Sequence, residues 1–171
     1  QGWSPEMTMR NLAFLAPLAA TLALAGATQA QPAAVSVSIG PDLQEKAADL
    51  GPREVLREVD RLAVTVRDAL TESGALQGAR VELVLTDLRP NRPTFEQMAR
   101  RPGLDGHRSI SIGGAAIEGE VITADGQRLP VRYRWYSRDL IDVHGYATWH
   151  DAERAFDRLA ANLVAGRLVT R

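Results

Sequence analysis

The chain has 171 residues, of which 45% are hydrophobic and 24% are charged, and its formal net charge is −1 at pH 7. This is enough apolar material for the core of one domain, and the near-neutral charge argues against nucleic acid as a partner. The absence of cysteine excludes disulfides, a thiol nucleophile, thiolate metal ligands and a lipid-modified cysteine.

The first 30 residues predict an export signal. Residues 12–25 (LAFLAPLAATLALA) follow a short positive stretch and form an apolar run that suits a signal peptide but is short for a membrane span. Small side chains place the cleavage site after Ala30, with Ala27 as the alternative. The residues before the first methionine look like a tag or an upstream extension. We therefore expect residues 31–171 to form a single domain in the periplasm, with no stable membrane anchor after cleavage.

The exported part begins with a predicted strand and a long amphipathic helix. Residues 35–39 (VSVSI) alternate β-branched and small polar side chains, and Gly40-Pro41 ends the strand. After a polar stretch, Pro52 occupies a favourable position in the first turn of a helix. Apolar residues then recur at helical spacing until Gly74, which predicts one buried face.

A second strand, residues 80–86 (RVELVLT), leads into a predicted loop rich in proline and arginine at residues 87–108. Within this loop, Thr94 and Gln97 have the spacing of a capping box, which predicts a short helix through residues 98–101.

Residues 109–123 contain strand material that is interrupted by two glycines. The apolar residues occupy even positions before Gly113-Gly114 and odd positions after them. A phase change of one residue at paired glycines predicts a bulge or a bend at this point.

A hairpin follows, and the side-chain pattern determines its register. A two-residue turn at Asp125-Gly126 would place Arg132 and Arg134 on the apolar face. A three-residue loop at residues 124–126, with a left-handed glycine, keeps them off that face. The predicted neighbours are Val121 and Leu129, Gly119 and Val131, Ile117 and Tyr133, Glu118 and Arg132, and Ala115 and Trp135.

A second long helix, capped by Thr148 and ending at Gly166, completes the chain. The order of elements predicts an α+β fold, a two-layer β-α-β-β-β-α arrangement. We expect an antiparallel-rich sheet with the two long helices on one face. The first helix can then be a right-handed crossover between parallel first and second strands.

Three short stretches and the Asp125-Gly126 turn carry a family resemblance. They are RPTFEQ at residues 92–97, PGLD at residues 102–105 and SIGGA at residues 111–115. In these stretches the chain resembles uncharacterised proteobacterial periplasmic proteins that are classed as domains of unknown function. Its element order is similar to the amino-terminal domain of TolB and to the curli-secretion lipoproteins. It lacks the acylated cysteine that the curli-secretion lipoproteins carry. The resemblance implies a binding or assembly role and supplies no catalytic residue.

The best candidate for a binding surface is the positively charged loop. Clustered guanidinium groups could hold carboxylates or phosphates, and Tyr136 is the aromatic side chain that the fold leaves freest. The alternative is a solvated loop whose arginines pair with Glu96 and Asp105. The candidate residues are Arg89, Arg92, Arg100, Arg101, His107, Arg108 and Tyr136.

The three histidines suggest an alternative enzymatic role. His144 and His150 lie six residues apart near Asp142 and Asp151, a spacing that fits neither a helical pair nor a zinc-protease motif. We therefore predict no metal and no cofactor. A small periplasmic hydrolase or a metal-dependent enzyme using His107, or His144 with His150, is the alternative.

The sequence thus predicts a periplasmic, non-catalytic binding or assembly module. The expected partner is an envelope protein or an anionic ligand. An exposed sheet edge could also pair with a second copy of the chain, so a homodimer, or a purely structural homo-oligomer, is a further alternative.

Overall fold

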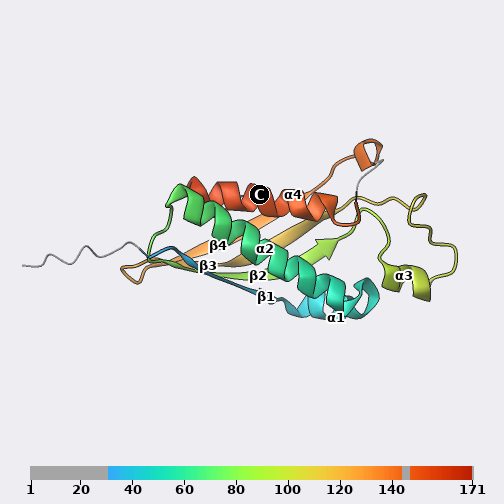
Figure 1. Ribbon diagram of the computed structural model, residues 1–171, viewed down its shortest axis with the longest axis horizontal. Helices are drawn as coiled ribbons and strands as arrows, with labels where there is room; N and C mark the ends of the chain where they lie inside the picture. The colour runs from blue at the N-terminus through green and yellow to red at the C-terminus, as the bar shows by residue number, and fades with distance from the viewer. Residues whose placement is uncertain (1–30, 144–146, 171) are drawn as a thin grey trace, which may run out of the picture.

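The computed structural model describes residues 31–143 and 147–170 (Figure 1). The expected export signal lies outside these residues. No helix in the described ranges is long and apolar enough to span a membrane. The elements in chain order are β1 (Ala34–Ile39), α1 (Pro41–Leu50), α2 (Pro52–Ser73), β2 (Arg80–Arg89), α3 (Phe95–Arg100), β3 (Gly114–Ile122), β4 (Arg128–Tyr136), the 3₁₀ turn η1 (Ile141–Val143) and α4 (His150–Val164).

The four strands form one mixed sheet in the order β1-β2-β3-β4. β1 and β2 are parallel and are joined through α1 and α2, whereas the other two pairings are antiparallel. The long helices α2 and α4 pack against each other and cover the same face of the sheet (Figure 1). The predicted α+β fold is therefore confirmed, including the parallel first pair of strands.

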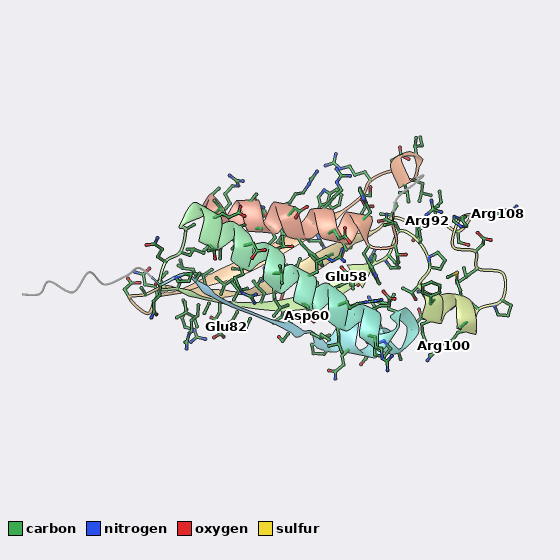
Figure 2. The ribbon with its side chains drawn as sticks, in the orientation of Figure 1. Glu58, Asp60, Glu82, Arg92, Arg100 and Arg108 are labelled. Carbon is green, nitrogen blue, oxygen red and sulfur yellow. The ribbon has the colours of Figure 1, made fainter. Side chains whose placement is uncertain are left out.

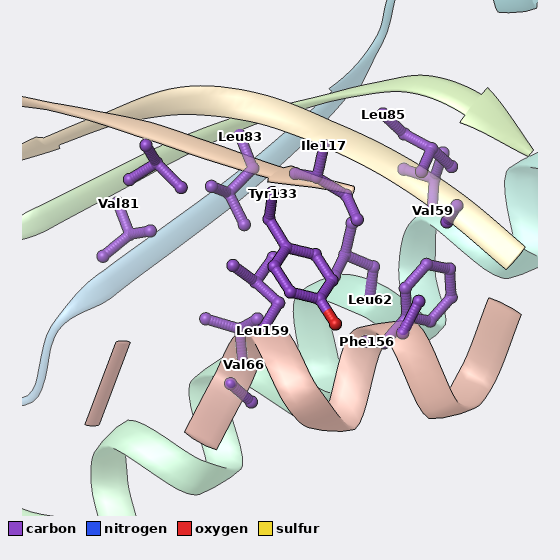
Figure 3. Packing of buried hydrophobic residues seen from close by; sticks show 14 of the residues in the cluster. Val59, Leu62, Val66, Val81, Leu83, Leu85, Ile117, Tyr133, Phe156 and Leu159 are labelled. Carbon is purple, nitrogen blue, oxygen red and sulfur yellow. The ribbon is translucent and has the colours of Figure 1, made fainter. Parts of the chain in front are cut away.

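The apolar core lies between this helical layer and the sheet (Figure 3). α2 and α4 contribute one stripe each, and β2, β3 and β4 contribute alternate residues, as an amphipathic helix over a half-buried sheet requires. The residues shown in the close-up include Val59, Leu62, Val66, Val81, Leu83, Leu85, Ile117, Tyr133, Phe156 and Leu159.

The hairpin between β3 and β4 has the predicted register. Val121 pairs with Leu129, Ile117 with Tyr133, and every other predicted neighbour is also found. The backbone N–H of Thr123 donates to the carbonyl of Gln127 at 2.9 Å, which closes the three-residue loop, and Gly126 has a φ of 86°. The prediction of a three-residue loop, which rested on keeping Arg132 and Arg134 off the apolar face, is therefore confirmed.

The polar stretch after β1 is a helix, α1, which the sequence analysis did not assign. Pro41 occupies its first turn, and only Leu43 and Leu50 of its residues are fully buried. Two apolar contacts seven residues apart give a narrow stripe, and neighbouring packing stabilises such a short helix.

Strand β2 is longer than predicted and carries the sheet irregularity. It continues through Arg89, so residues 87–89 belong to the sheet. The pairing with β3 shifts between Leu85 and Asp87, which places the bulge at Thr86. The register shift between β2 and β3 thus lies at Thr86 and not at Gly113-Gly114, where a bulge or a bend was expected. The predicted strand at residues 109–112 is wrong, because β3 begins at Gly114.

The two predicted helix caps have different outcomes. Thr94 and Gln97 form the predicted capping box, and α3 runs from Phe95 to Arg100, against the predicted short helix through residues 98–101. Thr148 does not cap α4, because the N-cap position is Trp149 and no side chain of the cap residue binds there.

Candidate functional site

The buried side chain of Asn91 organises the loops at one end of the molecule. Its backbone N–H donates to the carbonyl of Thr148 at 2.7 Å, and its carbonyl accepts from Ser111 at 2.9 Å. Its side-chain Nδ2 donates to the carbonyl of Ser111 at 3.2 Å. One residue after β2 therefore fixes the segment before β3 and the start of α4 relative to each other.

A groove of about 630 Å³ lies beside this junction, between α3, the beginning of α4 and the first turns of α2. We call it the Phe95 groove. Its apolar lining comes from Pro93, Phe95, Met98 and Trp149, and its polar lining includes Glu54, Arg57, His107 and Glu153.

The charged residues of the Phe95 groove are paired with one another or with their neighbours. The indole Nε1 of Trp149 donates to Glu54 Oε2 at 3.1 Å, and the other oxygen of Glu54 lies 2.5 Å from Arg57 Nη2. Glu153 forms an ion pair with Arg61. The rim charges are therefore balanced, and the groove is suited to an apolar guest more than to an ion.

Phe95 is the most exposed large hydrophobic residue of the described chain, with 81% of its surface accessible. A second hollow, of about 420 Å³, is also lined by Phe95, together with Pro52, Arg53, Glu54 and Glu96. Phe95 and Glu54 thus line both hollows. Exposed aromatic rings beside apolar hollows are typical of binding surfaces.

The support beneath Phe95 is rigid. α3 is held by its own capping box, in which Gln97 N–H donates to Thr94 Oγ1 at 3.2 Å. Gln97 Nε2 and Arg101 Nη2 both bind Asp49, at 3.0 and 2.6 Å, which ties α3 to α1. The backbone that carries Phe95 is therefore held in place by contacts on both sides of it.

The structure divides the candidate arginines among separate places. Arg100 pairs with Glu96 at 2.7 Å, and Arg101 pairs with Asp49. Arg92 donates to the carbonyls of Gly106 and His107. Figure 2 shows Arg92 and Arg108 along one side of the loop region and Arg100 on the opposite side, on α3.

Asp105 does not bind the arginine side chains as the solvated-loop alternative assumed. Its Oδ1 accepts from the backbone N–H groups of His107 and Arg108 at 2.7 and 2.8 Å, an Asx-type turn. These backbone hydrogen bonds lower the pKa of Asp105.

Arg89 and Tyr136 meet on the sheet, away from the Phe95 groove. Arg89 Nε lies 2.9 Å from Asp87 Oδ2, and its guanidinium carbon lies 4.5 Å from the centre of the Tyr136 ring. Tyr136 donates its hydroxyl to Asp87 Oδ2 at 2.7 Å, and Lys46 binds the other oxygen at 2.8 Å. Burial and the neighbouring Asp87 carboxylate raise the pKa of Tyr136 above its usual value.

A shallower hollow of about 350 Å³ brings Arg89 and Arg101 together beside Ser109 and Ser111. Of the predicted site residues, the structure thus unites this pair of arginines, unites Arg89 with Tyr136, and places His107 in the Phe95 groove. It does not assemble all of them into one positive patch.

The structure describes two of the three histidines that the enzymatic alternative named, His107 and His150. His150 is the first residue of α4, and His144 lies outside the described residues. No group of three or more His, Asp or Glu side chains converges on a potential metal position within residues 31–143 and 147–170.

Apart from His107, the residues that line the Phe95 groove were not among the predicted site residues. An aromatic residue directly after the capping threonine was visible at Phe95, but its exposure depends on how α3 sits against α1. Trp149 and Glu54 are 95 residues apart in the chain, so no local sequence pattern indicates that they are in contact. No protein-family model matches the chain, and no curated protein is significantly similar to it.

Proposed function

We propose that this chain is an exported binding module of the bacterial envelope, and that the Phe95 groove is the surface with which it engages a partner protein. The observation that carries the proposal is the exposed ring of Phe95, which lines two hollows and shares the larger one with Trp149. Covering a phenylalanine side chain contributes about 2–3 kcal/mol of hydrophobic free energy, so one ring can anchor an interface.

The chemistry of the groove indicates an apolar segment of the partner. Glu54 and Glu153 already have partners in Arg57 and Arg61, so the rim does not require a charged guest. A peptide segment that places an aliphatic or aromatic side chain between Phe95 and Trp149 would bury apolar surface without leaving a charge unpaired. Because α3 is pinned to α1, little conformational entropy is lost when the segment binds.

The envelope location rests on the amino-terminal pattern and on the resemblance to periplasmic proteins. Cell fractionation of a bacterium expressing the chain tests it directly. Release of a shortened chain by osmotic shock, with a new amino terminus near residue 31, would support export. Full-length chain in the cytosolic fraction would contradict it.

Selection from a random peptide library tests the binding proposal. The wild-type chain is the target, and the Phe95→Ala variant serves for counter-selection. We expect the retained peptides to share apolar anchors, to quench or shift the tryptophan fluorescence to which Trp149 contributes, and to bind Phe95→Ala at least about tenfold more weakly.

Ile141→Ala is the matched control, because Ile141 is 77% exposed and does not line the groove. Its peptide affinity should equal that of the wild type. Some peptides could bind the wild type and Phe95→Ala equally but lose affinity for the double variant Arg89→Ala plus Arg101→Ala. That result would place the contact surface at the hollow lined by Arg89 and Arg101 instead. Failure to select any groove-dependent peptide would also contradict the proposal.

A further inference from the structure

The two edges of the sheet differ in how they are protected. Along β4, the backbone of Arg132 donates to Leu168 and accepts from Thr170, both at 2.9 Å, so the carboxy-terminal segment covers part of this edge. The outer side of β1 has no strand neighbour within the described part of the chain. β1 is therefore the edge that is free to pair.

The sequences of the two edge strands match this difference. β4 exposes Arg128, Pro130, Arg132 and Arg134, and charged residues and proline are the usual protection against edge-to-edge pairing. β1 reads AVSVSI, with no charge and no proline, and it pairs with β2 over all six residues without a bulge. An unprotected, regular edge strand is a template for a further strand.

We propose that β1 pairs antiparallel with β1 of a second copy of this chain, about a two-fold axis at Val37. This register sets Val37 opposite Val37, Ser36 opposite Ser38, and Val35 opposite Ile39, so each side chain meets one of its own kind on the same face. Val35, Val37 and Ile39 are only half-buried in one copy, and the second copy covers them.

The flank of α2 provides an independent observation. α2 packs over β1, and Figure 2 shows Glu58 on the side of α2 that faces α4 and Asp60 on the side away from it. Helical spacing puts four residues on this side of α2, and we call them the outer stripe: Leu56, Asp60, Ala63 and Arg67. Leu56 is 53% exposed, and neither Asp60 nor Arg67 has an ion-pair partner in the described residues.

The stripe is self-complementary under the same two-fold symmetry. The two-fold axis that relates the paired β1 strands also makes the two α2 helices antiparallel to each other. Asp60 of one copy then faces Arg67 of the other, on either side of Ala63. Each unpaired charge gains its partner, and Leu56 is covered.

This dimer goes beyond the proposed function and does not depend on it. The Phe95 groove includes Glu54, at the start of α2, and therefore lies toward the end of the sheet where β1 finishes. Antiparallel pairing of β1 places the two grooves at opposite ends of the assembly. A partner with two apolar segments, or a repetitive partner, would then bind with avidity.

Sedimentation equilibrium of the purified chain, from about 1 µM to about 200 µM, tests the proposal. Ser36→Lys plus Ser38→Lys is the disrupting variant, because it sets lysine opposite lysine twice in the proposed register. We expect it to be monomeric, or to dimerise at least about tenfold more weakly, while its circular dichroism stays that of the wild type.

Ser36→Lys plus Ser38→Glu is the matched control at the same positions, because it sets lysine opposite glutamate. It should dimerise at least as well as the wild type. On α2, Asp60→Arg should weaken the dimer, and the exchange Asp60→Arg plus Arg67→Asp should restore it. A wild-type chain that is monomeric throughout, or lysine and lysine–glutamate variants that dimerise equally, would overturn the proposal.

Discussion

Asn91 binds the buried start of α4 through two hydrogen bonds to Asp151. Its Nδ2 donates to Asp151 Oδ2 at 2.6 Å, and its Oδ1 accepts from the backbone N–H of Asp151 at 2.8 Å. Both side chains are fully buried. Asn91 thus performs the capping role that the sequence analysis assigned to Thr148, from a position 60 residues away.

The carboxylate of Asp151 depends on this partner. It lies in the first turn of α4, where the helix dipole favours a negative charge. Its Oδ1 has no hydrogen-bond partner in the described chain, and the nearest cation, Arg154 Nη1, is 3.9 Å away. Asn91→Ala therefore leaves a buried carboxylate largely unpaired, and we expect a loss of about 3 kcal/mol in the free energy of unfolding.

Urea denaturation at neutral pH measures this loss. Asn162→Ala is the control, because Asn162 is an α4 residue that bonds to Arg167 at the surface, and its loss should cost less than about 1 kcal/mol. Equal effects of the two substitutions would show that the Asn91–Asp151 contact adds nothing special to stability.

Glu58 predicts an unusual dependence of stability on pH. Burial raises its pKa, and Glu54 adds to the increase, while Arg61 and Arg57 partly oppose it, so that the pKa is about 7 instead of 4.5. Its Oε2 has no hydrogen-bond partner within the described residues. The folded state binds the proton of Glu58 more tightly than the unfolded state does. Ionisation of Glu58 therefore does not destabilise the fold below pH 4.5, and the destabilisation grows with pH until the pH exceeds about 7.

Glu58→Gln should therefore stabilise the protein at pH 8 by up to about 3 kcal/mol and leave its stability at pH 4 nearly unchanged. Thermal or urea unfolding of both proteins across this range gives the difference. Glu72→Gln, an exposed change on the same helix, should alter the free energy of unfolding by less than about 0.5 kcal/mol at either pH. A constant difference between wild type and Glu58→Gln at all pH values would contradict the assignment.

The β3–β4 hairpin shows which features can be read from sequence. Residues in a strand alternate between faces, so a wrong register would have buried Arg132 and Arg134, and the correct one was the register that avoided this. The amphipathic stripe of α2 was equally informative, because one 22-residue helix repeats the same signal many times.

The paired glycines show what the sequence could not distinguish. Gly113 and Gly114 suggested a bulge, but both are required by close neighbours. A Cβ at Gly113 would lie 2.7 Å from Asn91 Oδ1, and one at Gly114 would overlap the backbone of Trp135. These contacts join residues far apart in the chain, as do those of Phe95 and Trp149, so no local pattern announces them.

The cluster around Asp87 predicts a dependence of stability on pH that is opposite to that of Glu58. Burial raises the pKa of Asp87, but hydrogen bonds from Lys46, Tyr136 and Arg89 outweigh it, so the pKa is lower than usual. The cluster therefore stabilises the fold above the unfolded-state pKa, and this contribution is lost as the pH falls through the lowered pKa.

Tyr136→Phe removes one hydrogen bond from this carboxylate and should cost about 1 kcal/mol at pH 7, with the difference shrinking as the pH falls through the lowered pKa of Asp87. Tyr133→Phe is the matched control, because the Tyr133 hydroxyl has no hydrogen-bond partner in the described chain, and it should cost less than about 0.5 kcal/mol. Identical denaturation curves for Tyr136→Phe and wild type at pH 7 would rule out a contribution from this hydrogen bond.

Gly119 is the position where the sheet tolerates a side chain least. Its φ is 153°, and a Cβ there would overlap the carbonyl oxygen of Glu82 on β2. Gly119→Ala must therefore separate the two central strands or strain the backbone, and we expect it to cost more than about 3 kcal/mol in the free energy of unfolding.

Substitutions at two other glycines distinguish the steric clash from the backbone strain. Gly126→Ala has open space but a φ of 86°, so it should cost about 1 kcal/mol from backbone strain alone. Gly106→Ala meets only an ordinary contact with Met98 and should change stability by less than about 0.5 kcal/mol. If urea denaturation ranks Gly119→Ala no lower in stability than Gly126→Ala, the close approach of β2 to β3 at this point is not what requires the glycine.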